Sequence, residues 1–100
     1  MNHIITDSVD KITALCEKHS VASLYVFGSV LTPSFNANSD IDFLVHFNTA
    51  DISDYVTNYF NFKSSLESEL GRSVDLVEDK SIRNPIFRHN VDRTKVPLYG

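Results

Sequence analysis

Two short apolar segments of the chain carry aspartate where a buried strand would not tolerate a charge. One spans residues 40–45 (D-I-D-F-L-V) and the other residues 74–77 (V-D-L-V). Because successive side chains of a strand point to opposite faces, Asp40 and Asp42 share one face and their apolar neighbours share the other. Asp75 likewise lies opposite the apolar residues beside it. The chain must therefore form a sheet with one apolar face and one face that leaves these carboxylates unburied.

Length and composition predict one small acidic domain. The chain has 100 residues, so we expect a single domain over residues 1–100, and its 42% apolar content excludes full disorder. Residues 1–80 hold 12 acidic and 5 basic side chains, whereas residues 81–100 hold one acidic and four basic ones. An acidic body argues against broad nonspecific nucleic-acid binding, which depends on Lys and Arg neutralising phosphates.

The N-terminus and the single cysteine favour a cytoplasmic protein. Residues 1–7 are short and polar, so we expect no signal peptide. Apolar runs such as Leu24–Phe27 are far shorter than the ~20 residues of a membrane helix, so we expect no membrane partner. Cys16 has no partner for an internal disulfide, which is typical of a reducing compartment, and its place on an apolar helix stripe indicates a small buried filler.

The pattern of apolar and turn-forming residues predicts an α+β fold. In chain order we expect a helix at 7–19 capped by Thr6, strands at 23–27 and 40–47, a helix within 52–70, a strand at 73–77, a helix at 85–92 and an edge strand at 96–99. Gly71 is placed to end the long helix, and Asn84-Pro85 is placed to cap and begin the last one. We expect a small mixed β-sheet backed by helices on one face.

The aspartates form a candidate metal site. Asp40 and Asp42 would repel each other without a cation or proton between them, and Mg²⁺ prefers such oxygen ligands. Asp75 occupies a mid-strand position that propensity disfavours, which is expected at functional sites. A solvated strand face for the first two residues, and an exposed edge strand for Asp75, are the alternatives.

Gly28-Ser29 is a candidate phosphate-binding turn. The pair directly follows a predicted strand and can open a short helix with Val30 and Leu31. Glycine lets a phosphate approach the backbone, serine adds a hydroxyl donor, and free N–H groups at a helix start attract anions. An ordinary turn is the alternative.

Together these residues resemble a known family. Gly28-Ser29, ten residues, then Asp40-Ile41-Asp42, with Asp75 on a later strand, is similar to the minimal nucleotidyltransferase (MNT) family of the DNA polymerase β-type nucleotidyltransferase superfamily. The resemblance implies a polymerase β palm-like fold and nucleotidyl transfer with two Mg²⁺ ions.

The resemblance also implies roles for these residues. Asp40 and Asp42 would bind the ion that carries ATP or another nucleoside triphosphate, and Asp40, Asp42 and Asp75 together would hold the second ion. Asp75 could also accept the proton of the acceptor hydroxyl. Gly28 and Ser29 would bind the β- and γ-phosphates.

Family membership further implies a partner. Many members are antitoxins of a HEPN-type ribonuclease toxin, and some inactivate it by transferring AMP from ATP to a tyrosine. One departure favours the alternative of an antitoxin that acts by binding alone, with weak or no catalysis. Thr32-Pro33 stands where many members have Arg-Gly. A Mg²⁺-dependent glycosyltransferase with an Asp-x-Asp motif is a third class, but such enzymes need more than 100 residues.

Several other side chains have two interpretations. His46 lies on the predicted strand face of Asp42, so it is either near the metals or a surface residue at the strand end. The basic residues near the C-terminus either form a solvated tail or include one that reaches phosphate or an acidic partner: Arg83, Arg88 and Arg93. The aromatic residues of the long helix are either core or an adenine pocket, and some of them could form an apolar patch for a partner: Tyr55, Tyr59, Phe60 and Phe62.

Overall fold

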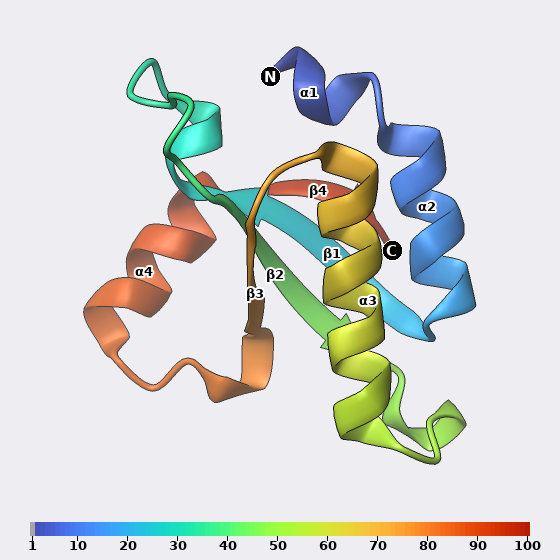
Figure 1. Cartoon of the computed structure of the whole chain (residues 1–100). Coiled ribbons are helices and arrows are strands. Elements are labelled where there is room, and N and C mark those ends of the chain that lie inside the picture. Colours follow the sequence, from blue (N-terminus) through green and yellow to red (C-terminus); the bar gives the residue numbers. More distant parts are fainter. Residues whose placement is uncertain (1) are drawn as a thin grey trace.

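The chain folds into a four-stranded mixed sheet with helices on both of its faces (Figure 1). The structure is a computed structural model that describes residues 2–100. The helices are α1 (His3–Thr6), α2 (Val9–Lys18), α3 (Tyr55–Leu70) and α4 (Pro85–Thr94). The strands are β1 (Val21–Phe27), β2 (Ile41–Phe47), β3 (Val74–Glu78) and β4 (Val96–Tyr99). Single turns of 3₁₀ helix are η1 (Gly28–Leu31), η2 (Thr49–Asp51) and η3 (Asp79–Ser81).

The strand order places the two aspartate-bearing strands side by side. The order across the sheet is β3-β2-β1-β4, with β1 antiparallel to both β2 and β4. β2 and β3 are parallel, and α3 makes the crossover that a parallel pair requires. The mixed sheet and the edge position of β4 confirm the predicted fold class.

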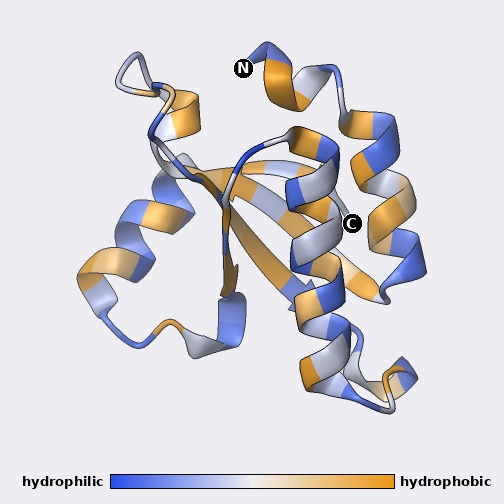
Figure 2. Ribbon diagram, in the orientation of Figure 1, coloured by the Kyte–Doolittle hydropathy of each residue, from blue (hydrophilic) through white to orange (hydrophobic). Residues whose placement is uncertain are grey.

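One face of the sheet carries the main core. The residues of β2 that alternate with Asp42 are fully buried there together with residues of α2 and α3: Ile41, Phe43, Val45, Ile12, Cys16, Phe62 and Leu66. Figure 2 shows the apolar colouring concentrated along the strands, whereas α2 and α3 alternate between polar and apolar colouring. The predicted alternation of β2 is therefore confirmed, as is the burial of Cys16.

The other face carries a smaller core under α4. Phe27, Leu44 and Val91 are buried together there, and Val91 comes from α4. The prediction that the helices all back one face is wrong in this respect, because α4 lies on the opposite side of the sheet from α2 and α3 (Figure 1). On this face of β2, Leu44 lies between Asp42 and His46. Only part of the face is therefore apolar, and α4 packs on that part.

The first predicted helix, at 7–19, forms as α2 from Val9 to Lys18, and a short helix α1 that the sequence did not predict precedes it. α1 ends at Thr6, which is therefore not a cap; instead the Asn2 side chain accepts a hydrogen bond from the Ile4 N–H at 2.9 Å. A turn at residues 7–8 separates the two helices. Each helix places an apolar residue in the core, Ile5 from α1 and Ile12 from α2.

The predicted start of the last helix and the predicted end of the long helix are confirmed, whereas α4 ends at Thr94, two residues later than predicted. The Asn84 side chain accepts hydrogen bonds from the N–H groups of Ile86 and Phe87, and Pro85 is the first residue of α4. Gly71 follows α3 in the left-handed conformation with φ +65°. Within residues 2–100 no helix combines the length and apolar character needed to cross a membrane.

We predict that Gly71→Ala lowers the free energy of unfolding by about 1 kcal/mol, because a side chain is strained at positive φ. Urea unfolding measures the change. No atom lies within 4 Å of the added Cβ, so the loss isolates backbone strain. Ser68→Ala, at an exposed position of the last turn of α3, is the control without such strain. Equal stability of the two variants would contradict this role of Gly71.

Candidate active site

Asp42 and Asp75 are direct neighbours across the parallel β2–β3 ladder. Their Cα atoms are register partners, with the Ile41–Val74 and Phe43–Leu76 pairs on either side. Side chains of paired residues project from the same face, and the flanking pairs enter the main core. Asp42 and Asp75 therefore both project from the opposite face, as the sequence predicts. Asp42 is half-buried and Asp75 is exposed.

Gly28 lies directly against the Asp42 carboxylate. Phe27, the last residue of β1, is the register partner of Asp42, and Gly28 follows it with φ +81°. A Cβ atom built on Gly28 would lie only 2.1 Å from Oδ2 of Asp42. The turn after β1 thus needs glycine for its backbone conformation and for the room that Asp42 occupies.

Ser29 lies in a single helical turn that begins at the strand end. η1 spans Gly28–Leu31, and the carbonyl of Ser29 accepts hydrogen bonds from the N–H and the hydroxyl of Thr32, each at 2.9 Å. Val30 is buried in the main core and holds this turn on the sheet. The prediction that a short helix opens at Gly28-Ser29 is confirmed, and it extends no further than one turn before Pro33.

Asp40 lies just outside β2 rather than in it. The ladder begins at Ile41, and Asp40 is exposed at the end of the loop that precedes the strand. The predicted strand boundary is therefore one residue too early. The negative charge of Asp40 nevertheless contributes to raising the pKa of Asp42.

Burial and like charge raise the pKa of Asp42 to about 6. Loss of solvent around the carboxylate is the largest cause, followed by the negative charges of Asp75 and Asp40. Among residues 2–100, no hydrogen bond or ion pair offsets the charge of any of these carboxylates. The negative charges of these carboxylates are therefore uncompensated, and a bound cation or a proton on Asp42 would reduce their repulsion.

The candidate ligands are of the type that Mg²⁺ prefers, but they do not form a preassembled metal site among the described residues. The candidate ligands are all carboxylate oxygens, which hard divalent ions prefer. Within the described chain, no group of three or more His, Cys, Asp or Glu side chains is close enough together to hold a metal ion. Binding would therefore have to draw the carboxylates of Asp40, Asp42 and Asp75 together, at a cost in mutual repulsion that the ion itself removes.

A groove lies between Asp42 and α4. One part, of about 310 Å³, is bounded by Gly28 and Asp42 on the sheet side and by one face of α4 on the other: Phe87, Asn90, Val91 and Thr94. A second part, of about 710 Å³, extends from Gly28 past Leu31 and Thr32 to Thr94 and Val96. The sequence analysis missed this wall, although residues 87, 90 and 94 follow the Asn84-Pro85 helix start at one-face spacing.

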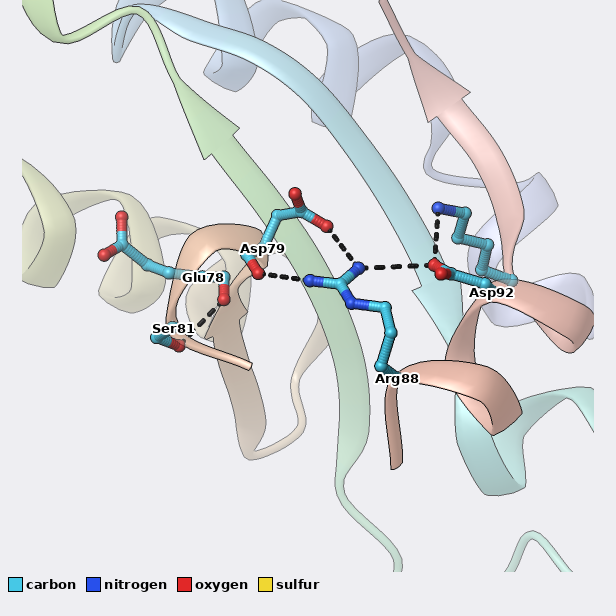
Figure 3. Close-up of polar contacts among 6 residues, drawn as sticks. Glu78, Asp79, Ser81, Arg88 and Asp92 are labelled. Carbon is cyan, nitrogen blue, oxygen red and sulfur yellow. Dashed lines mark hydrogen bonds and ion pairs between the residues drawn. The ribbon is translucent and has the colours of Figure 1, made fainter. Parts of the chain in front are cut away.

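An ion-pair network fixes α4 over the sheet. Nη1 of Arg88 lies 2.8 Å from Oδ1 of Asp79 and 3.3 Å from Oδ1 of Asp92, and Nη2 donates to the Asp79 carbonyl at 2.5 Å (Figure 3). Lys95 also reaches Asp92 at 3.0 Å. Arg88 therefore pairs with acidic residues of η3 and of α4. Arg83 and Arg93 are exposed and form no ion pair among residues 2–100.

His46 and the aromatic residues of α3 do not line the groove beside Asp42. His46 is exposed opposite Ser23 and lines a separate hollow of about 190 Å³ with Lys95. Of the aromatic residues of α3, Phe62 is core and Phe60 is 56% exposed. The hydroxyl of Tyr59 donates a hydrogen bond to the carbonyl of Leu76 on the edge strand β3.

Comparisons with known proteins agree on one family. The family model described as polymerase beta, nucleotidyltransferase, matches residues 10–100. Two proteins of Methanocaldococcus jannaschii, both named for an inferred protein adenylyltransferase activity, are 33% and 36% identical to this chain over 78 residues. These matches cover 78% of this chain and 77% and 76% of the two proteins.

Solved structures share the fold. One described as an inferred minimal nucleotidyltransferase has 28% identity and a TM-score of 0.78, covering 97% of this chain and 96% of its own. A toxin–antitoxin structure with AMP-PNP has 29% identity and a TM-score of 0.70, covering 92% of this chain and 73% of the matched one. A tri-AMPylated Shewanella oneidensis HEPN toxin in complex with its MNT antitoxin gives 27% identity and a TM-score of 0.65, with 95% and 71% covered.

We predict that Asp42→Asn stabilises the metal-free protein at pH 8 by about 1–2 kcal/mol, after allowance for solvent screening. The folded-state pKa of Asp42 is raised, so this group favours folding below its ordinary pKa and loses that contribution as the pH rises through about 6. Chemical unfolding in EDTA at several pH values tests this: the gain should shrink between pH 8 and pH 4. Asp10→Asn, at an exposed position of α2, is the control. A gain that is independent of pH would contradict the electrostatic account.

Proposed function

The chain belongs to the polymerase β nucleotidyltransferase family, and on that premise we propose that it transfers AMP from ATP to a tyrosine hydroxyl of a HEPN-type toxin, as the Mg²⁺-dependent antitoxin of a toxin–antitoxin pair. The observation that carries the proposal is the Asp42–Asp75 pair beside Gly28, which no cation of the described chain neutralises. Nucleotidyl transfer needs such a site, because it depends on positioning and on neutralising phosphate charge.

The partner and the transferred group are inferred from relatives. Structures 27–29% identical to this chain include a toxin–antitoxin structure with AMP-PNP and a tri-AMPylated HEPN toxin bound to its MNT antitoxin. Both matches cover more than nine-tenths of this chain. A cytoplasmic location, where such a toxin would meet ATP, remains a prediction.

In this proposal the groove between Gly28 and α4 holds the nucleotide. The triphosphate would lie at Gly28 and Ser29, where the absence of a side chain on Gly28 lets the phosphates approach the backbone. The base would extend along α4, where the ring of Phe87 lies edge-on to Phe27 at 6.1 Å and is 41% exposed. Asn90 and Thr94 follow Phe87 on the same helix face and offer polar groups to the nucleotide.

In the proposed reaction the three carboxylates share the binding of the metal ions, and Asp75 has the further task of accepting a proton. The tyrosine oxygen forms a bond to the α-phosphorus, the bond from that phosphorus to the oxygen bridging to the β-phosphate breaks, and pyrophosphate leaves. Asp75 is exposed, so it can meet the incoming acceptor and accept its proton. Asp40 and Asp42 would hold the Mg²⁺ of the nucleotide, and all three aspartates the second Mg²⁺. When bound, the ions stabilise charge on the attacking and leaving oxygens.

A second candidate function is neutralisation of the toxin by binding alone. Two observations favour it: Thr32-Pro33 provides no arginine beside the phosphate turn, and the carboxylates are not gathered in advance into a metal cluster within residues 2–100. In that case the acidic pair would be dispensable for protection from the toxin.

We predict that Asp42→Asn reduces AMP transfer about 100-fold or more, because a charged group that stabilises the transition state is lost. The assay combines labelled ATP, Mg²⁺ and purified HEPN-type toxin from the same genome, and follows label on the toxin. Asp10→Asn is the control and should transfer at the wild-type rate.

Neutralisation of the toxin in cells separates the two candidates. Transfer-dependent antitoxin activity requires that Asp42→Asn no longer protects. Full protection by this variant would establish binding alone, and the absence of transfer by wild-type protein would contradict the proposed enzyme.

We predict that Phe87→Ala raises the KM for ATP about five- to tenfold with little change in kcat, because stacking on an aromatic ring contributes to base binding and not to the chemical step. Ile86→Ala is the matched control: Ile86 is adjacent on α4 and 72% exposed, but does not line the groove. Equal KM values for the two variants would place the base elsewhere.

A further inference from the structure

Arg72 joins the loop before β2 to the start of β3. It follows Gly71, the residue that ends α3, and precedes the first residue of β3 by two positions. Its Nη2 atom donates to the carbonyls of Asn36 and Ser39, both at 2.6 Å. Its guanidinium carbon lies 4.4 Å from the centre of the Phe35 ring. One side chain thus makes three contacts with the 32–40 loop, the segment of residues 32–40 between η1 and β2.

These contacts fix the backbone on one side of Asp40, and the next residue of the chain fixes the other side. The carbonyl of Ser39 accepts from Arg72 at 2.6 Å, and the N–H of Ile41 donates to the carbonyl of Ser73 at 3.0 Å. Asp40 is therefore bracketed by hydrogen bonds to consecutive residues that lead directly into the strand of Asp75. The position of one candidate ligand is set by the strand that carries another.

Asp40 has few other restraints. It is exposed, lies outside the ladder, and repels Asp42, whose pKa its charge helps to raise. The other polar side-chain contacts of the 32–40 loop stay local within the described chain: they join residues of the loop to each other or to Ser29. Apart from the packing of Phe35 on the main core, Arg72 is what ties this loop to the sheet.

Arginine suits this position better than lysine. A single guanidinium nitrogen serves two carbonyls while the flat face of the group rests on an aromatic ring. A lysine ammonium keeps the charge and can reach one carbonyl, but it lacks the planar group that stacks.

We propose that Arg72 is a positioning residue: it holds the 32–40 loop so that Asp40 stays at the start of β2, where its carboxylate can join those of Asp42 and Asp75 when a divalent cation binds. The inference rests on the proposed function, which gives the cation its role in the reaction. It concerns how the loop supports metal binding and not the transfer step itself. Ligands held by a supporting shell lose less freedom on binding, so loss of the support should weaken metal binding.

The test is a calorimetric titration of the protein with Mn²⁺ in the presence of AMP-PNP. Arg72→Ala should weaken Mn²⁺ binding about tenfold, and Arg72→Lys should restore part of that loss. Phe35→Leu, which keeps an apolar contact and removes the ring under the guanidinium, should weaken it about threefold. Lys11→Ala is the matched control, since it removes a surface cation paired with Glu69 at 3.1 Å between α2 and α3.

A double-mutant cycle shows whether Arg72 acts through Asp40. In an Asp40→Asn background, Arg72→Ala should cause no further loss of Mn²⁺ affinity, because the ligand that it positions is already gone. Amide hydrogen exchange in the 32–40 loop should be faster in Arg72→Ala than in Lys11→Ala.

Three results would overturn the inference: wild-type Mn²⁺ affinity in Arg72→Ala, an equal further loss in the Asp40→Asn background, or wild-type protein that binds no Mn²⁺. A wild-type protein that binds Mn²⁺ but labels no HEPN-type toxin would contradict the proposed function and leave the role of Arg72 standing.

Discussion

The candidate site depends on two aspartates at paired positions of two parallel strands, Asp42 of β2 and Asp75 of β3. Asp42 and Asp75 are register partners, and the residues flanking each of them enter the main core, so neither side chain can turn away without removing its strand from the sheet. The repulsion between them is a cost of folding that burial of Asp42 increases. A domain of 100 residues has little stability to spare, and the divalent cation of the proposed function would offset this cost.

The surrounding elements make this pair accessible while keeping it in place. Gly28 gives the Asp42 carboxylate its room, and the turn that follows opens toward the groove. On the far side of that groove α4 is held by Arg88, which reaches both η3 and α4 itself (Figure 3). Arg88 links the end of the Asp75 strand to the groove wall, as Arg72 links its beginning to the loop of Asp40. β3 thus connects the loop of Asp40, Asp75 and the groove wall formed by α4.

Local sequence patterns predicted much of this arrangement. Alternation along β2 and β3 assigned the aspartates to one face, and turn chemistry located Gly28, Gly71 and Asn84, because these features depend on neighbouring residues alone. The register between Asp42 and Asp75 depends on the crossover through α3, which no local pattern encodes. The placement of α4 on the second face depends on the burial of Val91 with residues from two strands, so its amphipathic pattern could not indicate which face it covers.

The central claim is that Asp40, Asp42 and Asp75 come together around a divalent cation that they do not yet surround in advance. Crystals of the protein grown with Mn²⁺ and AMP-PNP, measured for anomalous scattering, test it most directly. The account predicts an anomalous peak bounded by the carboxylates of these aspartates, with the triphosphate beside Gly28. A nucleotide bound in the groove with no anomalous peak at the carboxylates, or with the peak elsewhere, would contradict it.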